Sequence, residues 1–368
     1  MKKFNLLLLL MSIIFILCSC KNNYSSSIKC NMINEYYKDT YNINNPNINS
    51  LTYEELIYIL ESDGNHLILF SEKINKNIKT FYHFSFKENG IDINSDSSIN
   101  TLSKELINRY FSNISSFTDK DNLNDTLILY NKNQKIIKLV ELNKNIDTFL
   151  KEIKTYQLSN YNDEYFFKTA YKTFNDEKIN LKNINYNQLI WLLNQKGNFI
   201  ICFAGAWCKN SQAVIKILNE YATKNNLTIY IFDTKLDGNY AKSHWNYQLN
   251  FSITSTSSNT YTNSLNKLYI DLITKYLSNI KTEYQTKFVT YIDDENNKIT
   301  AKLLQVPYLF LYNKDSKIIS HVEQMYTLDD TKDNYIYKEN NYLKYTSSIL
   351  ELLNEYAKLE NINISDIK

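Results

Sequence analysis

The chain has 368 residues, a formal net charge of +2, 43% hydrophobic residues and 14% aromatic residues. This length suits two domains better than one, and the near-neutral charge argues against nucleic-acid binding. The five glycines form no phosphate-cradling loop, and the four histidines have no metal-ligand spacing with one another or with the cysteines. The sequence therefore predicts no cofactor and no metal.

The first residues, 1–19, predict a secretory signal peptide. Two lysines precede an apolar run at 6–17, which is shorter than the roughly 20 residues that a membrane-spanning helix requires. The sequence Leu-Cys-Ser-Cys at 17–20 resembles the lipobox of bacterial lipoproteins, which implies cleavage before Cys20 and acylation of its sulfur. An ordinary signal peptide is the alternative. We expect lipid attachment at the extracytoplasmic face of a bacterial envelope membrane.

Residues 20–50 predict a flexible, largely polar tether that contains Pro46. After signal removal and lipidation, three thiols remain, which is too few for a disulfide framework. One of them, Cys30, lies in the tether. It is either inert, paired with another chain, or a mobile mate for a thiol of the folded part.

Two stretches of the chain repeat. LTYEELIYILESDGNHLILF (51–70) matches residues 184–203 at eight of twenty positions, with an offset of 133. TLILYNKNQKIIKLVE (126–141) matches residues 308–323 at ten of sixteen positions, with an offset of 182. We interpret these matches as an internal duplication with about 49 additional residues in the later copy. Chance similarity in a biased composition is the alternative.

Hydrophobic periodicity places helices and strands in both copies. The first copy, 51–157, is expected to hold a helix near 56–60, strands at 66–70, 127–130 and 135–140, and a helix at 146–156. The second copy, 183–365, is expected to hold helices at 189–193, 214–221 and 345–359 and strands at 199–203, 226–234, 309–312 and 317–322. Such alternation predicts an α/β fold with a mixed central sheet flanked by helices.

Two further segments lie outside this pattern. Residues 158–182 form an aromatic-rich linker between the copies. An insertion at about 239–300 contains an amphipathic helix marked by apolar residues from 265 to 276, followed by a solvated acidic turn at 293–295.

The second copy resembles the thioredoxin superfamily. Strand FIICFAGAWC (199–208), a helix after Cys208, strand TIYIFD (228–233) and VPYLFLYNKDSKII (306–319) follow the family's order. The resemblance implies that Pro307 is a cis-proline facing Cys208 and that Trp207 walls one side of the site. It covers about 183–365. The first copy acquires a thioredoxin-like fold only through the duplication, so the expected architecture is two tandem thioredoxin-like domains.

Cys208 has the surroundings of a nucleophile. At the first turn of a helix, unpaired N–H groups and the helix dipole favour a thiolate. In Cys208-Lys209-Asn210-Ser211, the second cysteine of a dithiol site is replaced by Ser211, as in monothiol C-x-x-S variants. A serine cannot resolve a mixed disulfide, but its hydroxyl can donate a hydrogen bond to the thiolate.

Cys202 is the second departure from the family. Thioredoxins keep a buried acid six residues before the reactive cysteine, where this chain has Cys202. One interpretation is a small apolar residue that fills a strand. The other is a second thiol that resolves Cys208 from beneath the helix.

The first copy lacks every site residue. The offsets place Asn75 where the second copy has Cys208, Ile78 where it has Ser211, and Asp125 where it has Pro307. We therefore expect the first copy to be degenerate and redox-inactive.

Three functions follow from these patterns. The first is monothiol thiol–disulfide exchange or mixed-disulfide capture through Cys208, with thiol- or disulfide-bearing proteins or peptides as partners. The second is a non-enzymatic lipoprotein that binds protein or peptide through a redox-inactive thioredoxin fold. The third is an accessory factor for export or maturation that docks through the insertion.

Overall fold

The computed structural model describes residues 34–43, 48–73, 81–90, 106–111, 123–159, 162–172, 174, 178–233, 267–283, 288–323 and 337–363. The predicted signal peptide, Cys20 and Cys30 lie outside these residues. No helix of the described residues is long and apolar enough to cross a membrane.

The chain divides into two compact units, residues 1–46 and 47–368. In the first unit, residues 34–41 are helical and the side chains of Tyr36 and Tyr37 are buried, in contrast to the flexible tether expected there. The predicted tether also overlaps the first strand of the second unit, which begins at Ile48. The sequence did not reveal these two ordered stretches, because they lie in a polar segment and neither is long enough to show a clear hydrophobic period.

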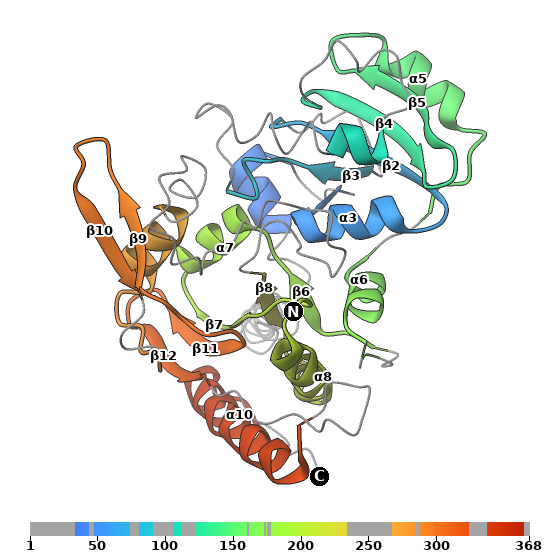
Figure 1. Ribbon diagram of the computed structural model, residues 1–368. Helices are drawn as coiled ribbons and strands as arrows, with labels where there is room; N and C mark the ends of the chain where they lie inside the picture. Colours follow the sequence, from blue (N-terminus) through green and yellow to red (C-terminus); the bar gives the residue numbers. More distant parts are fainter. Residues whose placement is uncertain are drawn as a thin grey trace, which may run out of the picture. The chain divides into compact units, whose positions relative to one another are not determined.

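The N-terminal sheet of the second unit has five strands in the order β1-β3-β2-β4-β5. β1, β3 and β2 run parallel, whereas β4 is antiparallel to both β2 and β5. Its strands and helices are β1 (Ile48–Ser50), α3 (Tyr53–Glu61), β2 (Asn65–Phe70), β3 (Phe81–Phe84), β4 (Thr126–Asn131), β5 (Lys135–Glu141) and α5 (Ile146–Ile153) (Figure 1).

The C-terminal sheet has the corresponding order β6-β8-β7-β11-β12. β6, β8 and β7 run parallel, and β11 is antiparallel to β7 and β12. The elements are α6 (Asp163–Ala170), β6 (Leu181–Asn183), α7 (Tyr186–Leu193), β7 (Asn198–Phe203), α8 (Lys209–Lys224), β8 (Ile229–Phe232), β11 (Tyr308–Asn313), β12 (Lys317–Val322) and α10 (Glu339–Glu360). The predicted α/β class with mixed sheets is therefore confirmed.

Equivalent residues of the two sheets make equivalent hydrogen bonds. Tyr130 Oη donates to Leu60 O at 3.0 Å, and Tyr312 Oη donates to Leu193 O at 2.9 Å. In both pairs the tyrosine lies on the strand antiparallel to the central parallel strand and satisfies a carbonyl at a helix C-terminus. A register shift follows Leu129 in one sheet and Leu311 in the other. The sequence offsets of 182 and 133 thus recur in the tertiary structure.

The two helices that precede the central strands begin in the same way. Thr52 caps α3 and exchanges hydrogen bonds with Glu55, while Asn185 caps α7 and exchanges them with Gln188. Both pairs form capping boxes, which satisfy two N–H groups at each helix start.

The insertion is partly described. A helical segment at 267–276, which ends in the π-helical turn η3 (Leu272–Tyr276), confirms the predicted amphipathic helix at those residues. A hairpin of β9 (Phe288–Ile292) and β10 (Lys298–Lys302) was not expected, although the predicted turn lies between its strands. Asp293 Oδ1 closes that turn by accepting hydrogen bonds from the N–H groups of Glu295 and Asn297.

Two helices cover the C-terminal sheet. α8 buries Val214, Ile217, Leu218 and Tyr221, the residues that the helical period predicted. α10 runs beside β12 and contacts β11 and β7 (Figure 1). Its core face includes Tyr345, Ile349 and Leu353, each fully buried. α8 also contacts β6 and β8 of the same sheet.

Candidate functional site: a thiol at the start of a helix

Cys208 is the N-cap of α8. Its backbone is extended, with φ −97° and ψ 121°, and its carbonyl accepts the first intrahelical hydrogen bond, from the N–H of Gln212 at 2.9 Å. Its side chain is half-buried and makes no capping hydrogen bond. The sulfur therefore lies at the N-terminus of α8, the positive end of the helix dipole.

The sheet brings Cys208 and Val306 together across the chain. β11 pairs antiparallel with β7, with Tyr308 opposite Phe203, so the residues just before β11 meet those just after β7. Cys208 Sγ lies 3.6 Å from Val306 O. The Val306–Pro307 peptide bond is cis, as the resemblance implied, and Pro307 is buried.

Trp207 is fixed by two residues that the sequence did not single out. Its Nε1–H donates to Asp233 Oδ1 at 2.9 Å, and Asp233, at the end of β8, is buried. The indole ring packs so closely over Gly205 that an added Cβ there would collide with it. The G in AGAWC was the available signal, because a glycine marks a close approach of other atoms to the backbone.

Ser211 does not contact the thiol as expected. It is fully buried, and its Oγ accepts a hydrogen bond from the N–H of Gly205 at 3.3 Å. Within the described part of the chain it forms no hydrogen bond with Cys208. The helix turns the Ser211 side chain inward to the loop backbone, so this residue shapes the loop that carries the site.

Gln212 holds the same loop from the other side. Its Nε2 donates to Ala206 O at 2.7 Å and to Ala170 O at 2.9 Å, and its Oε1 accepts from the N–H of Lys172 at 2.8 Å. A buried amide with three such partners links the loop before Cys208 to the segment after α6. Sequence inspection missed this residue because a glutamine on a helix is ordinarily a surface residue.

Cys202 is a strand residue with a fully buried side chain. Desolvation by burial raises the pKa of its thiol, and the nearby Cys208 raises it further. Both cysteines are free thiols. The structure thus agrees with the small apolar interpretation more closely than with a resolving thiol, because a buried neutral thiol is a poor nucleophile.

The corresponding edge of the first sheet carries different groups. Asn75 and Ile78 lie outside the described residues, but Asp125 occupies the position that matches Pro307. Ser71 Oγ donates to Asp125 Oδ1 at 2.6 Å. The first sheet therefore has a hydrogen-bonded serine and carboxylate at this edge, where the second sheet has the end of β7 and Pro307. Among the described residues of the whole chain, no cluster of His, Cys, Asp or Glu could hold a metal ion.

No family model matches the chain, and no curated protein matches it. Among solved structures, the crystal structure of ERdj5 form I is similar at 10% sequence identity and a TM-score of 0.22, over 90% of this chain and 32% of that one. This chain thus spans about a third of that protein's length, and so low a TM-score does not define a shared fold.

The fold and site define a mixed α/β protein that presents a half-buried thiol at a helix N-terminus. The thiol faces the carbonyl of a residue that precedes a cis-proline.

Proposed function

We propose that the chain is a thioredoxin-like protein of the bacterial envelope that captures thiol or disulfide partners through Cys208. The contact of Cys208 Sγ with Val306 O, at 3.6 Å, is the observation that carries the proposal. It sets a half-buried sulfur at a helix start against the backbone of the half-buried Val306, beside which a partner polypeptide can lie.

The chemistry is a single exchange. The Cys208 thiolate attacks one sulfur of a partner disulfide; a new S–S bond forms, the partner bond breaks, and the second partner sulfur leaves as a thiolate. Cys208 is oxidised to a mixed disulfide while the leaving sulfur is reduced. Since Ser211 has no sulfur and Cys202 is buried, no second thiol of the described residues releases the captured partner, and a thiol from another molecule or Cys30 does so.

The domain arrangement belongs to the same proposal. Two sheets of the same strand order, with matching tyrosine hydrogen bonds and matching capping boxes, support a duplication that gave two thioredoxin-like domains at 51–157 and 183–365. The first lacks a thiol at the site and is redox-inactive. Acylation at Cys20, proposed from the lipobox resemblance, anchors the protein to the membrane.

A trapping experiment tests the function. The wild-type chain and the variants Cys208→Ala and Cys202→Ala are each expressed in bacteria with export to the cell envelope. Free thiols are then blocked, and disulfide adducts are separated by electrophoresis without reductant. We expect reductant-sensitive adducts with the wild type and with Cys202→Ala, but not with Cys208→Ala. Equal adducts from all three proteins would refute the proposal.

A non-enzymatic binding role is the second candidate. The Ser71–Asp125 contact favours it, because the first sheet keeps a structured polar edge at the matching position without any sulfur. In this case Cys208→Ala retains every partner in a pulldown that includes reductant.

A further inference from the structure

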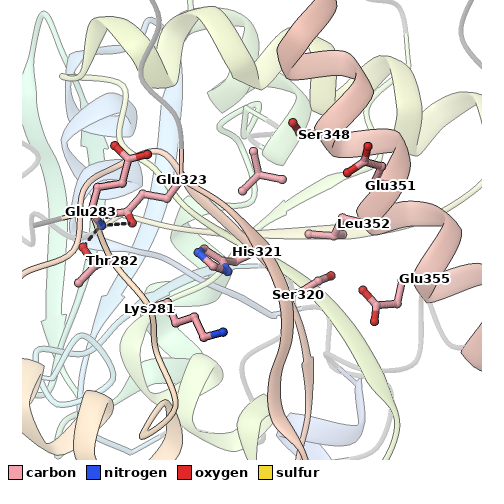
Figure 2. Close-up of a pocket in the computed structure, with 11 residues that line it drawn as sticks. Lys281, Thr282, Glu283, Ser320, His321, Glu323, Ser348, Glu351, Leu352 and Glu355 are labelled. Atoms are coloured by element: carbon pink, nitrogen blue, oxygen red, sulfur yellow. Dashed lines mark hydrogen bonds between the residues drawn. The ribbon is translucent and has the colours of Figure 1, made fainter. Parts of the chain in front are cut away.

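A pocket of about 540 Å³ lies between the outer strand of the C-terminal sheet and the last helix (Figure 2). Residues 320–323 of β12 and its end line one side, and the segment 281–283 closes another. α10 contributes residues at helical spacing, which places them on one face. They are Ser348, Glu351, Leu352 and Glu355.

The pocket is acidic on its helix side. Glu351 and Glu355 lie one turn apart on α10 and are drawn toward β12 in Figure 2. Neither carboxylate has a hydrogen bond or ion pair with any described residue. Like charges at this spacing repel one another, and a cationic group between them relieves the repulsion. Glu283 and Glu323 bring the carboxylates of the pocket lining to four, and Lys281 is the one lysine of that lining.

His321, in the middle of the pocket, does not offset this charge. Desolvation and the neighbouring Lys281 lower its pKa, an effect that Glu283 opposes. Its imidazole is therefore largely neutral at pH 7. The ring stacks on Tyr308, with centroids 5.2 Å apart and planes 21° apart, which holds it in place.

Two further features suit a long cationic side chain. Ser320 Oγ is buried and has no hydrogen-bond partner among the described residues, although it belongs to the pocket lining. A buried hydroxyl is normally paired, so this one is open to a donor from a ligand. Val322 and Leu352 are 5% and 2% exposed and provide an apolar wall for an aliphatic stem.

The pocket adjoins the thiol site through both neighbours of the Val306–Pro307 peptide. On one side, the N–H of Gln305 donates to Glu323 Oε1 at 2.9 Å, and Glu323 lines the pocket. On the other side, Tyr308 stacks on His321. Glu323 also accepts hydrogen bonds from Thr282 Oγ1 and the N–H of Glu283. Its carboxylate thus holds the surrounding backbone in place and is not assigned to the ligand.

We propose that this pocket binds the lysine or arginine side chain of a polypeptide whose cysteine reacts at Cys208. The inference rests on the proposed function and adds a substrate class to it, namely basic segments next to a cysteine. The ammonium or guanidinium group lies between Glu351 and Glu355 and donates to Ser320 Oγ, while its stem packs on Leu352.

The test uses three synthetic peptides that carry one cysteine as a mixed disulfide with thionitrobenzoate, flanked by two lysines, two glutamines or two glutamates. Release of thionitrobenzoate gives the rate with the full-length protein, and each rate is divided by that of the same peptide with N-acetylcysteine. We expect the lysine peptide to react roughly three- to tenfold faster than the glutamine peptide, as ion pairs with the exposed Glu351 and the half-buried Glu355 allow. The advantage should shrink in high salt.

Variants locate the effect. The double variant Glu351→Gln/Glu355→Gln and the variant Ser320→Ala should reduce the lysine preference, whereas Glu339→Gln, an exposed change on the same helix outside the pocket, should retain it. Equal normalised rates for the three peptides, or a preference unchanged in the double variant, would overturn the inference.

A second measurement separates this failure from failure of the proposed function. Serine analogues of the peptides are titrated onto the Cys208→Ala variant, and binding is followed by calorimetry. Binding of the lysine peptide, lost in the added double variant, supports the pocket even if no disulfide forms with the wild type. Rapid but charge-independent reaction at Cys208, without binding of any serine peptide, supports the thiol chemistry and refutes the pocket.

Discussion

Cys208 Sγ lies 3.6 Å from the carbonyl oxygen of Val306, a residue 98 positions further along the chain. The antiparallel pairing of β7 with β11 produces this contact, since it brings the end of one strand to the start of the other. These two residues place a half-buried thiol beside a backbone carbonyl.

The two thiols of the C-terminal half should differ sharply in reactivity. Cys208 is half-buried at a helix start, whereas Cys202 is fully buried and its thiol pKa is raised by desolvation. We expect iodoacetamide to modify Cys208 in the native protein and Cys202 only after unfolding in urea. Peptide mapping by mass spectrometry measures both. Comparable native rates at the two positions would show that the buried thiol is accessible.

Gly205→Ala should displace Trp207. The added methyl group collides with the indole ring, which then loses its hydrogen bond to Asp233. We expect a shift in tryptophan fluorescence, slower adduct formation at Cys208, and a loss of about 1–3 kcal/mol in the free energy of unfolding from overpacking. Asp233→Asn is the matched control, because the amide oxygen still accepts from Nε1–H. Wild-type fluorescence and rate in the glycine variant would contradict the described packing.

Tyr130→Phe and Tyr312→Phe should cost similar amounts of stability. Each change removes one hydroxyl that donates to a helix C-terminal carbonyl, at Leu60 or Leu193, and leaves that carbonyl without its partner. The expected loss is about 1–3 kcal/mol for each, measured by urea unfolding. Tyr165→Phe, at a residue 40% exposed, should change the free energy by less than about 0.5 kcal/mol. A large effect in one half alone would argue against equivalent roles.

Stability should fall as the pH drops below about 6.5, the ordinary histidine pKa. Desolvation lowers the pKa of His83, which is fully buried, and that of His66. Below pH 6.5 the unfolded state therefore binds more protons than the folded state, so the free energy of unfolding declines by at most about 1.4 kcal/mol per pH unit for each group. The decline ends below the folded-state pKa values.

Urea midpoints between pH 8 and pH 5 measure this dependence. His83→Gln removes one titrating group, so its curve should be flatter than that of the wild type. A variant that changes an exposed residue and no histidine, such as Glu339→Gln, should keep the wild-type slope of stability against pH. Parallel curves for His83→Gln and the wild type would show that His83 does not titrate differently in the two states.

The sequence by itself determined the secondary structure that rests on local pattern. Continuous apolar runs predicted β2, β7, β4 and β11, together with β5 and β12, which follow β4 and β11 after a polar turn. Helical spacing predicted α8 and α10, because these patterns depend on neighbours a few residues away. The two tyrosines that make equivalent contacts, Tyr130 and Tyr312, lie at matching positions of the repeated blocks. The sequence did not predict the short strands β1 and β6, since three residues are too few to show a hydrophobic period.

Only the tertiary structure decided which polar side chains surround Cys208. Ser211 turns toward the N–H of Gly205 in its own loop and not toward the sulfur. Gln212 is held by backbone groups of Ala170 and Lys172, which lie 42 and 40 positions away in the sequence. The acidic pocket likewise exists because α10 packs beside an edge strand, which brings Glu351 and Glu355 to the same pocket as Ser320. Side-chain partners are set by packing across the sheet, and no local period encodes them.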